Sequence, residues 1–375
     1  MKIGLVCPYN IAKGGGVQEI VYAMYRELIK RGHTVKIITP QPRDGSAQPA
    51  EDILFVGAAT DFRSPTHTSL QVSASVDSDA IGQMLEQEAF DVLHFHEPWV
   101  PVLSRQVLSR SNSVNIATFH GVVPETLMSR TVVKVVTPYS ISILKYLHEL
   151  TAVSEAAAEY VRTLTDEPLT IIPNGIDLSK YKKAQNRKPG APRTILYIGR
   201  LERRKGVKYL LQAYKLLTQQ LDNVSLVIAG DGPDREKLEL LAEDLELPNV
   251  SFLGFISEDL KTQLLQQAAV FCSPAVYGES FGIVLLEAMA TGAVTVAGNN
   301  SGYSALMQEL GAISIVNPHD ADEFARRLKL LVTEQSLREL WQTWADEYVQ
   351  QFNWPKVIDQ YEALYREALE RHREN

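Results

Sequence analysis

The sequence has few of the features that mark secreted, membrane-spanning or nucleic-acid-binding proteins. Only two cysteines are present, Cys7 and Cys272, and each ends an apolar run, so we expect buried free thiols in a reducing compartment. No apolar run approaches the roughly eighteen residues of a membrane span, and the start MKIGLVCPYN has too short an apolar stretch for a signal peptide. The formal net charge of −8 argues against nucleic acid as a partner. These absences predict a cytoplasmic protein.

What the sequence does contain is two series of apolar strands that alternate with amphipathic helices. The first series occupies residues 1–180 and the second residues 194–353, and the intervening segment 181–193, poor in apolar residues, is predicted to be a linker. The region Ala58–Ala80, rich in Ser, Thr and Asp, is expected to be a loop or a weakly structured insert. This alternation predicts an α/β protein with two doubly wound, Rossmann-like domains, each binding ligands at the carboxyl ends of its parallel strands.

The stretch from Phe271 to Gly292 carries the strongest functional signal. An apolar strand stops at Ser273 and Pro274, a short loop contains Glu279, and a helix with Glu287 follows. A helix start offers free backbone N–H groups and a partial positive charge, which can hold an anion without a metal. Glu279 could accept hydrogen bonds from sugar hydroxyls, and Glu287, two turns further on, could reach a ribose diol. Taken alone, two glutamates at this spacing are more often a loop residue and a solvated helix residue.

Two glycine-rich loops provide further candidate phosphate contacts. Gly14, Gly15 and Gly16 lie between the first strand and the first helix, where backbone can approach a phosphate closely. In the second series, the turn 199–206 (GRLERRKG) carries Arg200 and Lys205, which could stabilise a leaving diphosphate. Neither loop has the spacing of a dinucleotide fingerprint or a P-loop. A solvated basic turn is the alternative interpretation of the second one.

Two motifs that suggest a metal are better explained in other ways. His94 and His96 could share one face at a strand end, but no third ligand is close to them in the sequence. Asp77, Ser78 and Asp79 form a D-x-D triplet in a polar stretch without a preceding strand, so we interpret them as helix-capping residues. The sequence therefore predicts no metal site.

Four separated motifs, in the right order, resemble those of one enzyme family. The segment G-E-S-F-G-I-V-L-L-E-A-M-A-T-G at 278–292 resembles, nearly residue for residue, the donor-site signature of family-4 retaining glycosyltransferases of the GT-B superfamily. G-R-x4-K-G at 199–206, G-G-V-Q at 15–18 and T-F-H at 118–120 are similar to further motifs of this family, and in particular of its phosphatidylinositol mannosyltransferase branch. The resemblance implies a GT-B fold, with two domains facing a central cleft and a closing helix at 354–375 that crosses back onto the first domain.

The resemblance also implies roles for individual residues. It places the acceptor on the first domain and the donor mainly on the second, with no metal ion and no cofactor other than the nucleotide-sugar substrate. The implied catalytic residues are His120, Glu279, Arg200 and Lys205. The implied donor-binding residues are Gly15, Gly16, Ser280, Phe281, Gly282, Glu287, Phe255 and Ile256. We assign Tyr9 and Gln18 to the acceptor.

The function implied in this way is transfer of a mannose-type or glucose-type hexose from a GDP- or UDP-sugar to a hydroxyl acceptor. The acceptors to consider include membrane glycolipids such as phosphatidylinositol, which the enzyme would meet at the inner face of the membrane. One departure from the branch is that the stretch Thr60–Asp79 contains a single basic residue, Arg63, where the branch carries cations for a lipid phosphate. Another lipid or a soluble acceptor therefore stays open. The alternative functions are a GT-B sugar-nucleotide epimerase, a non-catalytic nucleotide-sugar-binding protein and, with least support, a glycosidase that uses Glu279 and Glu287.

Overall fold

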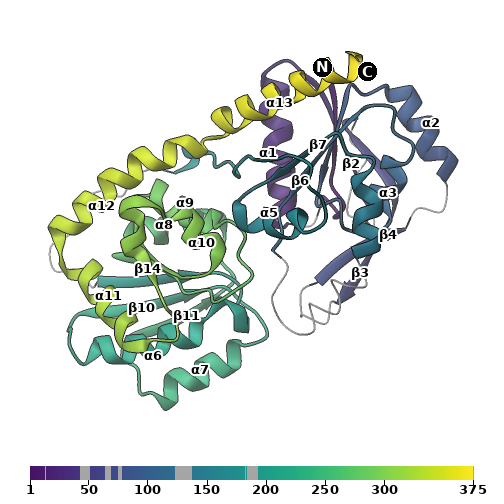
Figure 1. Ribbon diagram of the computed structural model, residues 1–375. Helices are drawn as coiled ribbons and strands as arrows, with labels where there is room; N and C mark the ends of the chain where they lie inside the picture. The colour runs from purple at the N-terminus through teal and green to yellow at the C-terminus, as the bar shows by residue number, and fades with distance from the viewer. Residues whose placement is uncertain are drawn as a thin grey trace. The chain divides into compact units, whose positions relative to one another are not determined.

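The chain forms two compact units in a computed structural model. The structure describes residues 1–375 except 13, 43–50, 64–68, 75–77, 123–136, 182, 184–192 and 375. One unit comprises Met1–Gly175 and Trp354–Asn375, and the other comprises Ile176–Asn353 (Figure 1). The chain thus leaves the first unit before the predicted boundary at residue 180. Most of the predicted linker lies outside the described residues.

The first unit is built on an eight-stranded sheet with the order β4-β3-β2-β1-β5-β6-β7-β8. Neighbouring strands are parallel except for the antiparallel pair β3 and β4. Strand β6 is buried along its whole length, as expected for a parallel strand covered by helices on both faces. The strands are β1 (Lys2–Val6), β2 (Thr34–Gln41), β3 (Ile53–Arg63), β4 (Ser69–Ala74), β5 (Val92–His96), β6 (Val114–Phe119), β7 (Glu149–Ala152) and β8 (Leu169–Ile171).

Amphipathic helices cover this sheet. Helix α1 buries Ile20, Val21, Met24 and Leu28 at helical spacing, which fixes the face that it turns to the strands. The helices of this unit are α1 (Gly16–Lys30), α2 (Ser78–Glu88), α3 (Leu103–Leu108), α5 (Glu155–Arg162) and α13 (Trp354–Glu374), together with a helical segment at 137–144. Ser154 caps α5 by accepting a hydrogen bond from the backbone N–H of Ala157.

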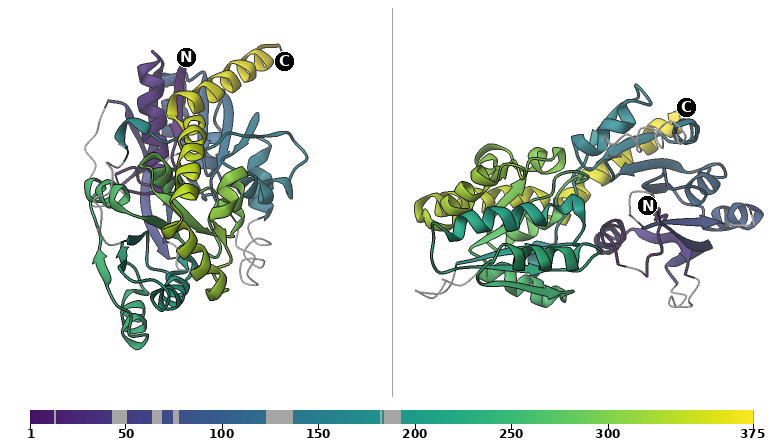
Figure 2. Two further views of the ribbon diagram at one scale, coloured as in Figure 1. Left: turned by 90° about the vertical axis from the view of Figure 1, so that its left-hand side faces the viewer. Right: turned by 90° about the horizontal axis from the view of Figure 1, so that it is seen from below.

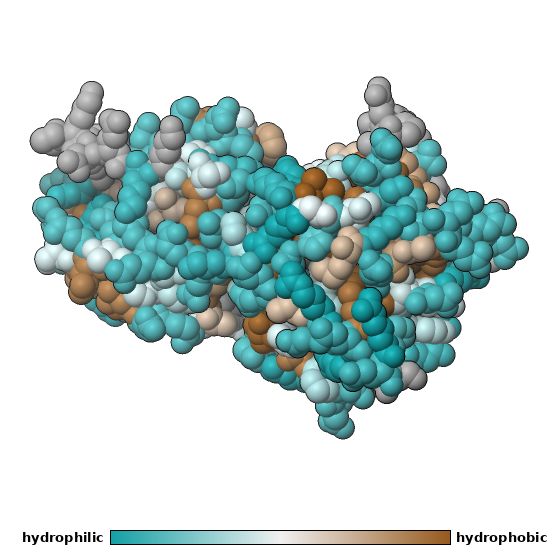
Figure 3. Space-filling view, turned by 90° about the horizontal axis from the view of Figure 1, so that it is seen from above, coloured by the Kyte–Doolittle hydropathy of each residue, from teal (hydrophilic) through white to brown (hydrophobic). Residues whose placement is uncertain are grey.

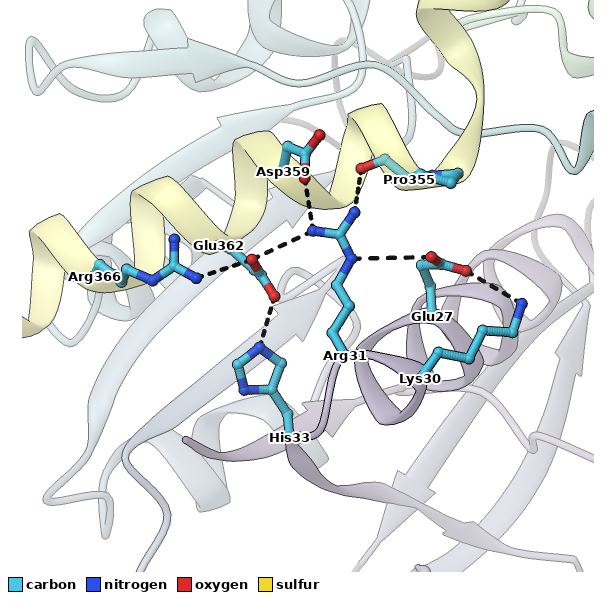
Figure 4. A network of polar contacts seen from close by, with 8 residues as sticks. All are labelled: Glu27, Lys30, Arg31, His33, Pro355, Asp359, Glu362 and Arg366. Atoms are coloured by element: carbon cyan, nitrogen blue, oxygen red, sulfur yellow. Dashed lines mark hydrogen bonds and ion pairs between the residues drawn. The ribbon is translucent and has the colours of Figure 1, made fainter.

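Helix α13 belongs to the first unit although it ends the chain. Arg31, just after α1, donates to the carbonyl of Pro355 at 2.6 Å and to the carboxylates of Asp359 at 2.7 Å and Glu362 at 3.3 Å (Figure 4). Nε2 of His33 lies 2.7 Å from the other oxygen of Glu362. These contacts fasten α13 beside α1, so the predicted return of the closing helix to the first domain is confirmed.

The second unit holds a six-stranded sheet, all parallel, with the order β11-β10-β9-β12-β13-β14. Its strands are β9 (Arg193–Ile198), β10 (Val224–Ala229), β11 (Val250–Gly254), β12 (Val270–Ser273), β13 (Val294–Gly298) and β14 (Ile315–Val316). Its α-helices are α6 (Val207–Thr218), α7 (Arg235–Asp244), α8 (Glu258–Gln267), α9 (Ile283–Ala290), α10 (Ser301–Leu306), α11 (Ala321–Thr333) and α12 (Gln335–Tyr348). Short 3-10 helices are η1 (Leu178–Lys180), η2 (Arg203–Lys205), η3 (Glu309–Ser314) and η4 (Val349–Phe352). Helices flank both sheets in the views of Figure 2, and the predicted class of two Rossmann-like domains is confirmed.

The prediction of a loop or weakly structured insert at Ala58–Ala80 was wrong for the residues of this range that the structure describes. Strand β3 runs on to Arg63 and pairs with β4 as an antiparallel hairpin, and α2 begins at Ser78. In the register, Phe62 is opposite Leu70 and Thr60 is opposite Val72. An edge hairpin needs apolar residues only at every second position, so its high content of Ser, Thr and Asp concealed a period-two pattern. Of the D-x-D triplet, Ser78 begins α2 and Asp79 lies in its first turn, whereas Asp77 lies outside the described residues.

Apolar side chains at the described surface are scattered. On the face drawn in Figure 3, hydrophobic areas are small and separated by hydrophilic ones. Within the described ranges, no helix has both the length and the apolar character needed to cross a bilayer. Both cysteines are free and buried, as predicted. The most exposed large apolar side chain among the described residues is that of Phe255, at 90%.

Candidate functional site

In the second unit, the loops at the carboxyl ends of the strands pack so closely that their backbone atoms are in contact. Gly206 has a φ of 70°, and a Cβ at this position would lie 2.1 Å from the carbonyl oxygen of Pro274. A Cβ on Gly302 would lie 2.2 Å from the carbonyl oxygen of Glu279. Only glycine allows backbones to approach this closely. These two contacts hold the turn after β9 and the loop after β12 in fixed positions, and so determine where Glu279 lies.

Glu279 is paired with two cations from the turn after β9. Its Oε1 accepts hydrogen bonds from Nη1 of Arg204 and from Nζ of Lys205, both at 2.7 Å. Arg204 also donates through Nε to Glu202 at 2.7 Å and through Nη1 to the carbonyl of Gly278 at 3.2 Å. Burial opposes the charge on Arg204, but the carboxylates of Glu279 and Glu202 outweigh it and raise the pKa of Arg204. The predicted pair Glu279 and Lys205 therefore lies together in a half-buried charged cluster.

Arg200 and Arg204 occupy different environments in the same turn. Arg200 is exposed, and within the described part of the chain its side chain makes no hydrogen bond or ion pair. Its carbonyl accepts hydrogen bonds from the hydroxyl of Tyr197 at 2.9 Å and from the backbone N–H of Glu202 at 3.1 Å. Arg204, which was not among the residues predicted from the sequence, contacts Glu279 directly. The available signal was the run of three cations at 203–205, of which the family motif selects only the last.

Glu287 also has partners. Its Oε1 accepts hydrogen bonds from the hydroxyl of Tyr181 at 2.9 Å and from Nζ of Lys261 at 2.8 Å. Lys261 forms a second ion pair with Glu258 at 2.7 Å. Burial opposes the charge on Lys261, yet the two carboxylates raise its pKa. Lys261 and Tyr181 were not among the residues predicted from the sequence. A diol that binds Glu287 would share the carboxylate of Glu287 with these two donors.

The start of α9 presents backbone rather than side chains. Gly282 precedes the helix with a φ of 110° and provides no side-chain cap. Phe281 is 6% exposed, and its ring packs edge-on against Phe352 with centroids 5.8 Å apart. The predicted donor contacts of Phe281 and Gly282 can therefore come only from backbone groups, while Ser280 lies half-buried beside Glu279.

Phe255 and Ile256 follow directly after β11. Gly254 has a φ of 71°, which turns the chain sharply out of the strand. The ring of Phe255 is largely exposed to solvent, and Ile256 is half-buried. An apolar ring held at the end of a parallel strand is available to stack on a flat ligand.

In the first unit, three histidines form a buried column at the carboxyl ends of β5 and β6. His94 and His96 stack with ring centroids 4.4 Å apart, and Nδ1 of His96 lies 2.9 Å from Nε2 of His120. His94 is fixed on both sides, by the hydroxyl of Tyr365 and by that of Thr118, each at 2.6 Å. The third histidine, distant in the sequence, thus joins the pair that shares a strand face.

All three histidines are neutral at pH 7. Burial lowers the pKa of His94 and of His120 to about 3 and lowers the pKa of His96 well below its usual range. The side chain of Asn174 opposes this effect weakly at His120 but lies outside hydrogen-bond geometry. Nδ1 of His120 and Nε2 of His96 have no hydrogen-bond partner among the described residues. His120 is therefore suited to exchanging neutral hydrogen bonds, not to acting as a cation.

Glu97 connects the two strand ends that carry these histidines. Its Oε1 accepts hydrogen bonds from the backbone N–H groups of His120 and Gly121. Burial raises the pKa of Glu97, and these two N–H groups partly offset that effect. Its φ of 48° is uncommon for a residue other than glycine and is held by these contacts. Glu97 therefore fixes the backbone position of His120.

The remaining predicted residues lie in the loop after β1 and at the start of α1. Gly15 precedes the helix and Gly16 begins it. A Cβ on Gly15 would lie 2.5 Å from Oε1 of Gln18, so the side chain of Gln18 folds back over this glycine. Tyr9 is half-buried, and its carbonyl accepts a hydrogen bond from Thr39 at 2.8 Å. Among the described residues, no group of three or more His, Cys, Asp and Glu side chains is arranged to hold a metal ion.

Comparison with protein families and known proteins gives a consistent result. Residues 14–180 match the family described as Glycosyltransferase Family 4, and residues 179–347 match Glycosyl transferases group 1. The phosphatidyl-myo-inositol mannosyltransferase of Mycolicibacterium smegmatis is 31% identical over 97% of this chain and 93% of its own length. The enzyme of the same name from Mycobacterium tuberculosis strain H37Rv is 32% identical over 97% and 96%.

Solved structures agree on the fold. Sucrose-phosphate synthase from Thermosynechococcus elongatus superposes with a TM-score of 0.78 at 20% identity and covers 98% of each chain. Anabaena HepE in complex with UDP and glucose superposes with a TM-score of 0.76 at 17% identity over 98% of this chain and 100% of its own. Two family matches that together cover most of the chain, and relatives of this extent, decide the assignment. The chain belongs to glycosyltransferase family 4, and the enzyme class predicted from its motifs is confirmed.

Proposed function

We propose that the enzyme transfers a hexose of mannose type from a GDP- or UDP-sugar to a hydroxyl of a lipid-linked acceptor, with retention of anomeric configuration and without a metal ion. The observation that carries this proposal is the cluster of Glu279, Arg204 and Lys205 beside the start of α9. It supplies carboxylate, cations and backbone N–H groups at the carboxyl edge of one parallel sheet, which suits a sugar attached to a diphosphate.

In this proposal each part of the donor meets a different set of residues. Arg200, Lys205 and the first N–H groups of α9 bind the diphosphate. Glu287 accepts hydrogen bonds from the ribose, and Phe255 and Ile256 border the base. Gly15 and Gly16, at the start of α1, belong to the same proposed set of donor contacts.

The reaction breaks the bond between the anomeric carbon and the leaving phosphate oxygen. Positive charge develops on the sugar ring while negative charge develops on the diphosphate, and Lys205 and Arg200 stabilise the latter. The acceptor hydroxyl forms the new bond on the same face of the ring and transfers its proton to the departing phosphate. Glu279 and the neutral His120 hold hydroxyls of the sugar and so orient the ring.

The lipid-linked acceptor is supported by the relatives' names. Two of them are named for phosphatidyl-myo-inositol, and a third, 28% identical over 75% of this chain, is named as a GDP-mannose:cellobiosyl-diphosphopolyprenol alpha-mannosyltransferase from Komagataeibacter xylinus. Helix α2 contains acidic residues and no Lys or Arg, so it offers little attraction to an anionic bilayer. We therefore propose that recognition of the hydroxylated head group, with Tyr9 and Gln18 as contacts, brings the acceptor to the first unit at the inner face of the membrane.

The test is transfer of labelled sugar from GDP-mannose or UDP-glucose. Acceptors are vesicles that contain phosphatidylinositol, vesicles that contain polyprenol-diphosphate-linked cellobiose, and lipid-free buffer, each with magnesium or with excess EDTA. We expect label in the lipid extract, an α linkage by NMR, and equal rates with and without the chelator. Free sugar or an epimerised donor as the main product would contradict the proposal, and so would activity that EDTA abolishes and metal restores.

A further inference from the structure

Four charged side chains of the second unit form a neutral set. Arg204 and Lys205 contribute two positive charges, and Glu202 and Glu279 contribute two negative charges, all within ion-pair distance. The exposed fractions of the four side chains lie between 11% and 25%, so solvent screens them only partly. A diphosphate that approaches this cluster finds its cations already neutralised. At least one cation must therefore change partners for the cluster to bind the ligand's charge.

The two cations differ in how firmly they are held. The guanidinium of Arg204 has three acceptors, namely Glu202, Glu279 and the carbonyl of Gly278. In the described part of the chain, Nζ of Lys205 donates only to Glu279. A planar guanidinium engaged on three sides exchanges partners less readily than an ammonium group on a flexible stem. Lys205 is thus the cation that can leave Glu279 without disrupting other contacts.

We infer that Arg204 is a positioning residue, the permanent counter-ion of Glu279, and that Lys205 is shared between Glu279 and the diphosphate of the donor. This inference rests on the proposed function. In the free enzyme Lys205 neutralises Glu279. When a nucleoside diphosphate binds, Lys205 moves to the phosphate, and Glu279 keeps Arg204 and accepts hydrogen bonds from the sugar. Release of the diphosphate restores the original pair.

Competition for Lys205 has a consequence that a merely structural cluster would not have. Glu279→Gln removes the competitor and should tighten binding of a nucleoside diphosphate about two- to fivefold, the range expected for losing one partly exposed ion pair. Arg204→Gln leaves Lys205 as the remaining cation on Glu279 and should weaken binding by a similar factor. The two substitutions therefore move affinity in opposite directions, although both remove one charge from the same ion pair.

A double-mutant cycle tests the inference by calorimetry with GDP, UDP and inorganic pyrophosphate. Arg204→Gln should weaken binding in the wild-type background and have no measurable effect in the Glu279→Gln background. Arg204→Lys should restore part of the affinity. Arg203→Ala is the matched control, because Arg203 is exposed on the same turn and its side chain forms no hydrogen bond or ion pair within the described residues. Thermal melts identify any variant that does not fold.

The outcomes separate the inference from the proposed function. Equal weakening by Arg204→Gln in both backgrounds would show that Arg204 binds phosphate directly or acts only on the fold, and would overturn the inference. Unchanged or weaker binding by Glu279→Gln would also overturn it, and in both cases the proposed donor site would stand. If none of the three ligands binds the wild-type enzyme, the proposed function fails and the inference fails with it.

Discussion

The carboxyl ends of the two sheets carry different polar chemistry. In the second unit, Arg204, Lys205 and Glu279 are half-buried and form ion pairs through a single carboxylate oxygen of Glu279. In the first unit, His94, His96 and His120 are buried, stacked and neutral. One edge is built from ions that can exchange partners, and the other from uncharged hydrogen-bonding groups held in one arrangement.

This difference matches the two tasks of a sugar transfer. A leaving diphosphate gains negative charge during the reaction, so the groups that bind it need charge of their own. Sugar and acceptor hydroxyls stay close to neutral, and fixed neutral donors and acceptors orient them without a large cost of desolvation. Four experiments test whether this difference between the two units holds.

Removal of Lys205 should have the largest effect. We expect Lys205→Ala to lower turnover roughly a hundredfold or more, the scale of losing one group that stabilises transition-state charge. Stability should change little, because the side chain belongs to a partly exposed turn. Steady-state kinetics with the identified donor measure the effect, and Arg203→Ala removes the same charge from the same turn as the control. Equal losses in both variants would show that net charge matters and position does not.

Gly302→Ala should be the next largest change. A Cβ there meets the carbonyl oxygen of Glu279 at 2.2 Å, and backbone cannot yield as a flexible side chain can. We expect a loss of about 1–3 kcal/mol of stability, as for overpacking, with lower turnover because the Glu279 loop shifts. Denaturant unfolding gives the stability. Gly82→Ala on α2 is the matched control, because a Cβ at Gly82 meets no described atom within 4 Å; a similar loss in both variants would disprove the specific contact.

Glu287→Gln should raise the Michaelis constant of the donor about tenfold and leave turnover nearly unchanged. A ribose contact is made equally in the ground state and the transition state, so its loss appears in binding alone. Glu258→Gln serves as the control, because Glu258 contacts the same Lys261 but its side chain is 83% exposed. If turnover falls instead and the Michaelis constant is unchanged, Glu287 contacts the reacting sugar.

The histidine column should give the smallest effect under working conditions. Since the pKa of His94 and of His120 is about 3 in the folded state, both stay neutral while the unfolded chain takes up protons below about pH 6.5. Stability should therefore be lost as the pH falls from 6.5 towards 3, by up to about 1.4 kcal/mol per pH unit for each histidine. The His120→Gln variant should lose less stability over this pH range, because one of the two histidines is absent. If the imidazole NMR resonances of these residues titrate near neutral pH, the histidines are not held in the neutral form by burial.

The sequence predicted the parallel strands and pointed to Glu279 and Lys205, which the structure brings together, because strands and short motifs are both local patterns. Apolar runs in the sequence predict buried strands, and the residues of the segment 278–292 form one contiguous motif. The hairpin of β3 and β4 was missed because its apolar residues alternate within a polar composition. Arg204 was missed because its importance depends on Glu279, which is 75 positions away. Contacts such as Lys261 with Glu287, or Tyr365 with His94, exist only after folding brings distant segments together.

The direct test is to measure by calorimetry how tightly a nucleoside diphosphate binds to the wild type, to Lys205→Ala and to His120→Ala. It asks whether the charged residues of the second unit bind the diphosphate while the neutral histidines of the first unit do not. The ligand carries the diphosphate but no hexose, so it reports on the charged edge alone. We expect Lys205→Ala to weaken binding tenfold or more, the equivalent of losing one charged hydrogen bond. We expect His120→Ala to stay within about twofold of the wild type, since a neutral contact to the absent hexose contributes nothing to binding of this ligand. Unchanged binding by Lys205→Ala, with a large loss by His120→Ala, would contradict both expectations.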